Sequence, residues 1–443
     1  MAEKDIKLDP WGSFQIEDYS KVIKQFGIEP FDAQGLPDPP AIFRRGVIFG
    51  HRGFNSIRRA IRLKRPWAVL TGLMPSGYMH LGNKVVFDQV RYYQRLGADI
   101  FILVADIESF AARGRSFEYA RNMAIEAYIL NYIAMGLEPT RCQIYFQSKR
   151  QLVKDMGYML GRKVNWAQLR AIYGFGDQTN MAHVFAPLVQ VGDILHVQAD
   201  HYGGPRPTVV PVGVDQDPHI RLTRDIAAAH RLFNVGETKD GRIGVFVKVD
   251  EDVPALLKEA EAVLRQLGHK NLEVMVNYKA IYVNDAEGAD EIMEIDEDLV
   301  PIEKRRGGWG FLPPSSTYNR FMTGLTGGKM SSSIPQSAIF LNEKPEDARK
   351  KVMESKTGGG QTMKEHQEKG GRPEVCSVYE MLLFHFEPDD AALRKIFEDC
   401  KGGKQLCGNC KNMVADRLVA FLKDLAVKRE AARGRLNDYL AKD

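Results

Sequence analysis

The fold is decided by residues 72–83, which read Gly-Leu-Met-Pro-Ser-Gly-Tyr-Met-His-Leu-Gly-Asn. An apolar run, Ala68 to Leu70, precedes this segment, and apolar residues recur after it at helical spacing, namely Leu81, Val85, Val90, Tyr93 and Leu96. A strand that turns through glycines into an amphipathic helix presents backbone N–H groups at the start of the helix. The segment therefore predicts a phosphate-binding turn between a strand and a helix.

The alternation of strand and helix continues along the chain. Apolar strands are expected at Ile100 to Ala105, Gln143 to Gln147 and Val209 to Val214, with amphipathic helices between them. Apolar strands that alternate with helices indicate crossover connections and a parallel sheet covered on both faces. The expected fold class is α/β, with a Rossmann-type parallel-sheet domain whose ligands bind at the carboxyl ends of the strands.

Changes in composition predict five segments. Residues 1–65 are an N-terminal extension that mixes aromatic and basic residues, among them Trp11 and Phe14. Residues 66–236 and 309–345 are expected to form the two parts of the sheet domain, and residues 346–443 a helical domain. The lysine- and glutamate-rich residues 237–308 predict an inserted α+β module with a strand from Ile243 to Val249, a helix from Val253 to Leu267 and a strand-like run from Leu272 to Val283.

A second segment, residues 327–333, predicts a mobile loop and reads Gly-Gly-Lys-Met-Ser-Ser-Ser. Two leading glycines allow such a loop to open and close. Lys329 is a point charge on a flexible stem, suited to following phosphate groups as they depart. No GxxxxGK[ST] run occurs in the chain, so a P-loop site is excluded.

The composition is that of an ordinary globular protein. The chain has 443 residues, 44% of them apolar, and a formal net charge of +4, so two or three domains are expected. A net charge close to zero says little about nucleic-acid binding, because a nearly neutral protein can still carry a basic patch on its surface. No apolar run approaches the roughly 20 residues that span a bilayer. Because Met1 to Pro10 is charged and has no apolar core, nothing suggests secretion, and we expect a cytoplasmic protein.

Residues 72–83 and 327–333 together resemble the HIGH and KMSKS signatures of class I aminoacyl-tRNA synthetases, which activate an amino acid with ATP and pass it to tRNA. The resemblance implies that His80, Asn83 and Lys329 stabilise the charge that develops on the α-phosphate, with Mg²⁺ present. It also implies an ATP site formed by Gly72, Pro75, Ser76, Gly77, Gly82, Lys329, Met330, Ser331 and Ser332. Asn83 departs from the family's usual histidine, although bacterial tryptophanyl enzymes commonly have asparagine there.

Other segments narrow the resemblance to tryptophanyl-tRNA synthetases, chiefly of the archaeal and eukaryotic kind. They are Asp9-Pro10-Trp11, Phe43-Arg44-Arg45-Gly46 with His51-Arg52, Val214-Asp215-Gln216-Asp217-Pro218-His219, and Ser337-Ala338-Ile339-Phe340-Leu341. The resemblance implies L-tryptophan and tRNA(Trp) as partners and a homodimer. Two alternatives remain: a tyrosyl-tRNA synthetase, and a catalytically silent paralogue that binds tryptophan or RNA.

The resemblance also indicates how tryptophan would be held. It assigns Glu108, Gln190 and Gln216 to the amino group of the amino acid. The positions that contact the indole nitrogen in eukaryotic enzymes are Leu70 and Leu103 here, and leucine cannot accept a hydrogen bond. Bacterial enzymes use an aspartate in a segment that aligns with residues 191–195, which makes Asp193 the candidate acceptor. The alternative is that Asp193 caps a helix.

Four of the five cysteines lie close together near the end of the sequence: Cys376, Cys400, Cys407 and Cys410, separated by 23, six and two residues. In a cytosolic chain this cluster favours a metal over disulfides. Some tryptophanyl-tRNA synthetases bind a [4Fe–4S] cluster with nearly the same spacing, while structural Zn²⁺ and unliganded thiols are the alternatives. The basic stretch from Lys411 to Arg435 flanks these cysteines, and the resemblance implies anticodon binding there, with phosphate contacts from Lys411, Arg417 and Lys423.

Overall fold

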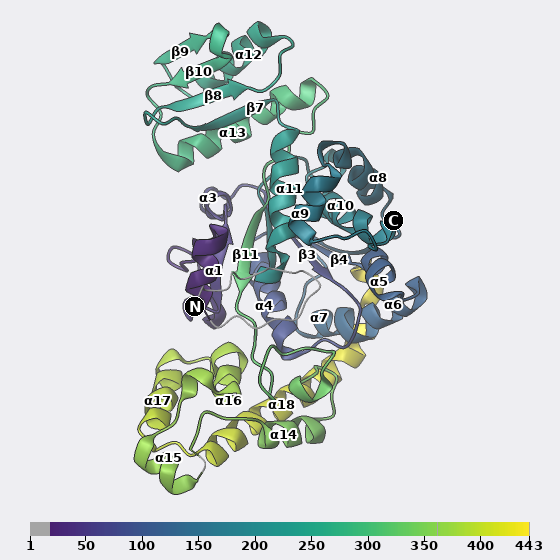
Figure 1. The fold of residues 1–443 in the computed structure, drawn as a ribbon, viewed down its shortest axis with the longest axis vertical. Coiled ribbons are helices and arrows are strands. Elements are labelled where there is room, and N and C mark those ends of the chain that lie inside the picture. Colours follow the sequence, from purple (N-terminus) through teal and green to yellow (C-terminus); the bar gives the residue numbers. More distant parts are fainter. Residues whose placement is uncertain (1–17, 361, 443) are drawn as a thin grey trace.

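The structure, a computed structural model, describes residues 18–360 and 362–442. The predicted segment Asp9-Pro10-Trp11 and Phe14 lie outside the described residues. A small α+β module lies at one end of the elongated molecule, the large sheet domain in the middle and a helical domain at the other end (Figure 1). None of the described helices is both long enough and apolar enough to span a membrane.

The central sheet has seven strands in the order β1-β2-β11-β6-β3-β4-β5. Their bounds are β1 Glu29–Pro30, β2 Ile48–Arg52, β3 Ala68–Leu73, β4 Asp99–Val104, β5 Cys142–Phe146, β6 Thr208–Gly213 and β11 Ser315–Asn319. The five strands from β11 to β5 pair in parallel, as the alternation of strand and helix predicts. The prediction needs correcting at one edge, because the N-terminal extension supplies β1 and β2, and β2 pairs antiparallel with β11.

Helices cover both faces of this sheet, and the side chains of β3 show how. Val69 and Leu73 belong to the core shared with α4 (Leu81–Arg95), α7 (Leu130–Ala134) and α18 (Cys407–Arg433). Leu70 instead packs with Ile194 of α10 (Met181–His196) and Ile220 of α11 (Asp217–Ala229). Because successive side chains of a strand point to opposite faces, the apolar run of β3 serves both layers. The remaining helices of this domain are α1 Tyr19–Phe26, α2 Ala41–Arg44, α3 Asn55–Leu63, α5 Asp106–Arg113, α6 Phe117–Ala124, α8 Gln151–Leu160 and α9 Trp166–Tyr173.

The inserted module has its own sheet and core. Its strands, in the order β7-β8-β10-β9, are β7 Phe233–Glu237, β8 Ile243–Val247, β9 Leu272–Met275 and β10 Ala280–Val283, and α12 Val253–Gln266 and α13 Gly288–Arg305 contribute to the same core. The run from Leu272 to Val283 is therefore not one strand but a hairpin, whose turn places Lys279 in the left-handed region at φ 51°. Ion pairs from α3 to α13, among them Arg59 to Glu297 at 2.7 Å, join the module to the sheet domain.

The helical domain follows β11. Its helices are α14 Pro345–Glu354, α15 Met363–Lys369, α16 Ser377–Met381, α17 Asp390–Lys401 and α18 Cys407–Arg433. The long α18 packs along α14 and then against α7, so it runs from the helical domain back to the sheet domain (Figure 1). The chain then returns to the edge strand of the main sheet, where Leu440 bridges to Ile144.

Candidate active site

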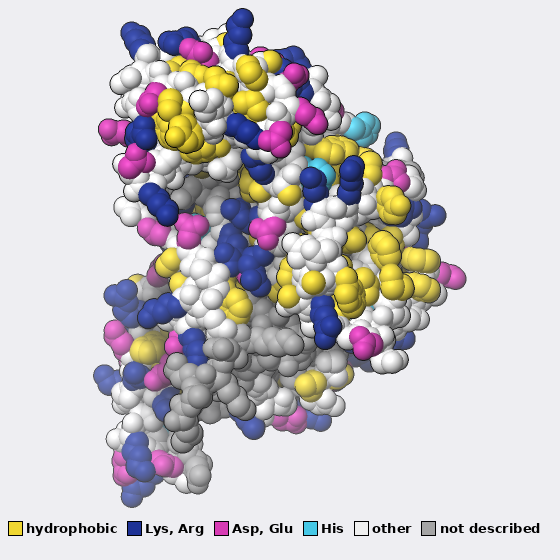
Figure 2. Space-filling model, turned by 45° about the horizontal axis from the view of Figure 1, so that its top comes forward, with side chains coloured by type: hydrophobic (Ala, Val, Ile, Leu, Met, Phe, Trp, Pro, Cys, Tyr) yellow, Lys and Arg dark blue, Asp and Glu magenta, His cyan; other side chains and the backbone are white. Residues whose placement is uncertain are grey.

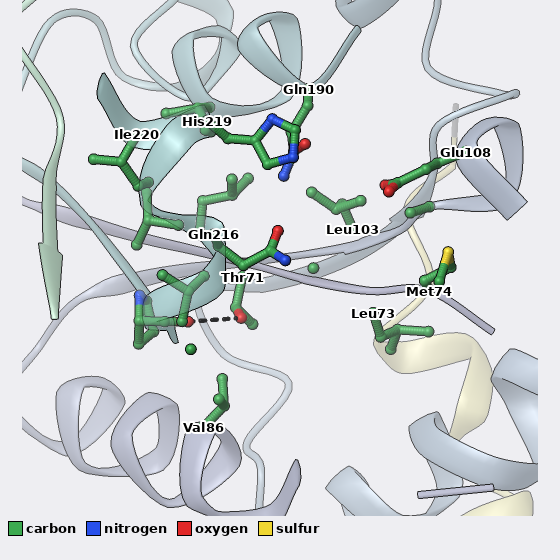
Figure 3. A pocket seen from close by; sticks show the side chains of 18 of the residues that line it. Thr71, Leu73, Met74, Val86, Leu103, Glu108, Gln190, Gln216, His219 and Ile220 are labelled. Atoms are coloured by element: carbon green, nitrogen blue, oxygen red, sulfur yellow. Dashed lines mark hydrogen bonds between the residues drawn. The ribbon is translucent and has the colours of Figure 1, made fainter. Parts of the chain in front are cut away.

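A cavity of about 230 Å³ opens at the carboxyl ends of β3, β4 and β6, where ligands of parallel sheets bind (Figure 3). Apolar side chains form much of its wall: Leu70, Leu73, Met74, Val86, Leu103, Ile194, Val210, Val212 and Ile220. The hydroxyl group of Thr71 donates a hydrogen bond to the carbonyl oxygen of Pro211 at 3.3 Å, which is the dashed line in Figure 3. The cavity therefore combines a wide apolar surface with a few polar side chains, as small-molecule sites do.

The three side chains predicted to hold an amino group all line this cavity. They are Glu108 of α5, Gln190 of α10 and Gln216, which immediately precedes α11. Figure 3 shows the Glu108 carboxylate and the Gln216 carboxamide pointing into the same space, and it labels Gln190 among the side chains that line it. Three separate elements thus bring one carboxylate and two carboxamides together, an arrangement suited to an ammonium group.

His80 and Asn83 stand at the start of α4. The backbone N–H of His80 donates to Oδ1 of Asn83 at 3.1 Å, so the two residues close the first turn of the helix. The imidazole is buried, and its Nδ1 has no hydrogen-bond partner among the described residues. Burial and, second, the charge of Lys329 lower the pKa of His80 to about 4. The ring is therefore neutral at pH 7.

The loop that carries Lys329 lies against the same turn. Backbone hydrogen bonds hold it: Met330 N donates to Met322 O at 2.9 Å, and Thr323 bridges to Lys329. A Cβ added to Gly77 would lie 3.0 Å from the side chain of Ser332, so the two loops touch at that glycine. The structure thus brings the segments around His80 and Lys329, some 250 residues apart in the chain, to one place.

Lys329 has partners that sequence reasoning did not assign. Its Nζ lies 3.2 Å from Oδ2 of Asp215 and 3.8 Å from the centre of the Phe321 ring. Burial raises the pKa of Asp215, and the lysine opposes that rise. The Asp-Gln-Asp-Pro segment was the available signal, because it places an aspartate directly after β6 at the ligand-binding edge. A second cavity, of about 370 Å³, adjoins the lysine and is lined by Tyr19, Arg320, Phe321, Met322, Thr323, Gly328, Glu374, Val375 and Glu380.

The other residues predicted to bind ATP fall into three groups. Gly72 lines the first cavity, and a Cβ on Gly82 would lie 3.0 Å from the His80 ring. Pro75 and Ser76 lie in the turn after β3, where Ser76 N donates to Met74 O at 2.8 Å. In the loop, Ser331 and Ser332 are half-buried, whereas Met330 is part of the hydrophobic core. The Met330 side chain therefore anchors the loop in the core.

Asp193, the predicted indole acceptor, lies behind the wall of the cavity. The residue is fully buried in α10, and its two carboxylate oxygens accept hydrogen bonds from Tyr145 Oη, at 2.8 Å, and from Gln147 Nε2. Burial, opposed by these hydrogen bonds, raises the pKa of Asp193 to about 7. The lining residue is Gln147 rather than Asp193, and sequence reasoning did not identify it.

The four clustered cysteines surround one small cavity in the helical domain. Cys376, Cys400, Cys407 and Cys410 line it together with glycines and apolar side chains. Burial and, second, the neighbouring thiol of Cys376 raise the pKa of Cys400 to about 11 and of Cys410 to about 12. Within the described residues, no three histidine, cysteine, aspartate or glutamate side chains stand where they could hold a metal ion. Cys142 is separate, buried in β5.

Comparisons with known proteins show which chains this one is similar to. The family model of class I tRNA synthetases (W and Y) matches residues 62–250 and 290–423. The tryptophan–tRNA ligase of Thermoplasma volcanium is 46% identical, over 98% of this chain and 99% of the relative. That of Methanosarcina acetivorans is 44% identical, over 98% of each chain. The solved structure of tryptophanyl-tRNA synthetase from Aeropyrum pernix superimposes with a TM-score of 0.74 at 37% identity, covering 98% of this chain and 100% of that one.

Near full-length similarity to these enzymes leads to one assignment, and the signature turn and lysine loop meet beside an apolar cavity. The chain belongs to the family of class I tRNA synthetases that comprises the tryptophan and tyrosine enzymes.

Proposed function

We propose that this chain is a tryptophan–tRNA ligase, which activates L-tryptophan with ATP to tryptophanyl-adenylate and transfers the amino acid to tRNA(Trp). The observation that carries the proposal is the meeting of two elements at one sheet edge. An apolar cavity with Glu108, Gln190 and Gln216 lies beside a turn and loop that bring His80 close to Lys329. The tryptophan–tRNA ligases similar over nearly the whole chain support tryptophan as the amino acid.

The roles follow from the position of each group. Glu108, Gln190 and Gln216 bind the ammonium group of tryptophan, which leaves the carboxylate to attack the α-phosphate. His80 and Asn83 at the start of α4 and Lys329 from the loop stabilise the charge on the phosphates as pyrophosphate leaves. Magnesium bound to ATP supplies further neutralisation of the phosphates. Because a neutral imidazole can donate a hydrogen bond, the lowered pKa of His80 does not prevent this role.

ATP–pyrophosphate exchange with single amino acids tests the proposal. We expect exchange with tryptophan at a kcat/KM at least about 10²-fold above that with tyrosine or phenylalanine, since unmatched polar groups in a buried site reject such analogues. Exchange with tyrosine alone would support the tyrosyl alternative. Binding of tryptophan without exchange would support the silent paralogue.

The domain organisation belongs to the same proposal. Residues 66–236 and 309–345 form the catalytic domain, residues 237–308 the inserted module and residues 346–443 the anticodon-binding domain, after the N-terminal extension of residues 1–65. The basic α18 supports RNA binding by the last domain, and Lys423 is exposed there. Lys411 and Arg417 also contact protein groups, namely Met353 O at 2.8 Å and Glu387 at 2.9 Å. We therefore expect Lys423→Ala to weaken tRNA binding more than Lys411→Ala, as measured by filter binding.

A [4Fe–4S] cluster at Cys376, Cys400, Cys407 and Cys410 is our proposal for the thiols, with Zn²⁺ as the alternative. Its support is that all four thiols line one cavity. Four thiols are the donors that such a cluster takes, although no three metal-binding side chains of the described residues stand where they could hold a single ion. Anaerobically purified protein should show visible iron–sulfur absorbance and bound iron. Bound zinc without that absorbance would support the Zn²⁺ alternative. Protein purified without any metal would support neither the cluster nor zinc.

Two further features complete the proposal. The chain forms a homodimer through the sheet domain and works in the cytoplasm. Large apolar side chains are exposed on neighbouring helices, namely Tyr158, Met159, Trp166, Met181 and Phe185, and Figure 2 shows apolar side chains gathering on this side of the molecule. Such patches mark interaction surfaces. Sedimentation should give twice the mass of 49.9 kDa for the wild type and the single-chain mass for a Trp166→Glu, Met181→Glu variant.

A further inference from the structure

Gln147 is a buried polar side chain that lines the first cavity. It follows β5 directly, where its backbone N–H donates to Val104 O at 3.1 Å, so the residue is tied to the carboxyl edge of the sheet. Its side chain lines the cavity and is only 1% exposed. A buried carboxamide at a ligand-binding edge needs partners for both of its ends.

The protein satisfies only one end of this carboxamide. Nε2 donates to Oδ2 of Asp193, while Oε1 has no hydrogen-bond partner among the described residues. A carboxylate accepts and cannot donate when ionised, so the nitrogen must be the end that faces Asp193. The oxygen is therefore the unpartnered end of a side chain that lines the cavity, and an acceptor buried without a partner is costly unless a ligand satisfies it.

Asp193 is fixed in place by its surroundings. Tyr145 Oη donates to its other oxygen at 2.8 Å, and Tyr145 lies on the same face of the sheet as Gln147 because the two are two residues apart. Around them, Arg150 stacks over the Tyr145 ring at 3.9 Å and contacts His196 Nε2 at 3.0 Å. The orientation of the Gln147 carboxamide is thus set before any ligand arrives.

Part of the cavity wall on this face of the sheet is apolar. Leu103 faces the same side of the sheet as Tyr145, its partner in the β4–β5 register, and it packs with Leu70 and Ile194 in one cluster. All three line the cavity. One fixed acceptor in an apolar slot matches a flat aromatic group that carries a single N–H donor.

We propose that Gln147 Oε1 accepts the indole N–H of tryptophan and that Asp193 acts through Gln147 as a positioning residue. This inference rests on the proposed function and deepens it, because it names the group that reads the amino acid. The acceptor for the indole N–H is then the neutral carboxamide of Gln147, which lines the cavity, and not the carboxylate of Asp193 behind it.

The test compares tryptophan with 3-benzothienyl-L-alanine, in which sulfur replaces the N–H, by ATP–pyrophosphate exchange. The wild type should prefer tryptophan by roughly 10²-fold or more in kcat/KM, because the analogue leaves Oε1 unsatisfied. Gln147→Met, nearly equal in shape, should reduce that preference to within about tenfold. Gln89→Met is the matched control, since Gln89 is an equally buried glutamine that does not line the cavity and accepts from Thr317 Oγ1 at 2.8 Å. Its preference should equal that of the wild type.

Asp193→Asn provides the second variant if Gln147→Met does not fold. An asparagine can donate to Oε1, which lets the Gln147 carboxamide turn and present a nitrogen to the cavity. We expect the preference for tryptophan over the analogue to collapse in this variant too. An unchanged preference in either folded variant overturns the proposal, as does a wild type that uses both amino acids equally well. A wild type with no tryptophan exchange at all is instead the failure of the proposed function.

Discussion

Two buried carboxylates mark the two sides of the active site and are paired in opposite ways. On the amino-acid side, Asp193 accepts hydrogen bonds from two neutral groups, Tyr145 and Gln147. On the phosphate side, Asp215 pairs with the charged Lys329 of a loop that starts with two glycines. Neutral hydrogen bonds between well-packed elements favour a fixed geometry, whereas an ion pair to a loop residue can be exchanged for another anion. Under the proposed function, selection of the amino acid rests on neutral hydrogen bonds between packed elements, and phosphate chemistry on an ion pair that an incoming anion can replace.

The largest effect should come from removing the movable cation. Lys329→Ala should lower kcat of pyrophosphate exchange by about 10²–10³-fold, the usual loss when one preorganised charge or donor is removed. The melting temperature should fall as well, because the variant leaves the buried Asp215 carboxylate without its ion pair, so kcat is compared at a temperature where both enzymes are folded.

Lys344→Ala is the matched control, since Lys344 is an exposed lysine just before α14. It should exchange like the wild type. A Lys329→Ala enzyme with near-normal kcat would show that the loop serves another purpose.

The second largest effect should be a pH dependence of tryptophan binding on the amino-acid side of the site. The pKa of Asp193 is raised to about 7, and the groups that act on it are Gln147, Tyr145, Glu108 and Arg150. A protonated Asp193 can donate to Oε1 and let the Gln147 carboxamide turn, so tryptophan affinity should fall as the pH drops below about 7, by up to about tenfold per unit. Burial keeps His196 and His219 neutral, with each pKa lowered to about 3, so they do not titrate in this range.

The stability of the folded protein should change in the opposite direction to tryptophan affinity and be higher at low pH. Because the folded chain favours the neutral acid, Asp193 contributes stability that is present at low pH and is lost as the pH rises from its ordinary pKa of 3.8 through about 7. Calorimetric tryptophan titrations and thermal unfolding from pH 5.5 to 8.5 measure both trends. Asp193→Asn should remove both, and an affinity that is constant or improves in acid would contradict this account.

The smallest effect concerns packing on the fixed side. A Cβ at Gly192 of α10 would overlap Val153 O of α8 and approach Gly157 N to 3.1 Å. Gly192→Ala should therefore lower the free energy of unfolding by about 1–3 kcal/mol. Gly77→Ala on the phosphate side meets only the side chain of Ser332 and should cost less than about 0.5 kcal/mol. Urea unfolding of both variants measures the difference, and equal losses would argue against a rigid side and a movable one.

The sequence predicted the layers of the fold well because apolar periodicity reports burial directly. It missed the antiparallel edge because β1 and β2 are short and lie in an extension without clear periodicity. It merged β9 and β10 because Val276 and Tyr278 continue the apolar and aromatic pattern of the strands through the turn between them, where Asn277 is the one turn-favouring residue. A single asparagine among such residues is a weak turn signal.

For the site, the two sequence motifs located both loops, because glycines beside a histidine or a lysine are typical of phosphate-binding segments. A motif does not show how deeply a side chain is buried in the folded protein. The resemblance over residues 191–195 indicated Asp193, but only the packing of α8 and α10 with Tyr145 of β5 sets it behind Gln147. The available signal for Gln147 was its position directly after an apolar strand, on the same face as Tyr145.

The most direct test is a crystal structure with the sulfamoyl analogue of tryptophanyl-adenylate. The account predicts the indole nitrogen about 3 Å from Gln147 Oε1, the ammonium group at Glu108 and the sulfamoyl group between His80 and Lys329. An indole nitrogen bonded to some other group, or a ligand that reaches only one of the two sides, would contradict it.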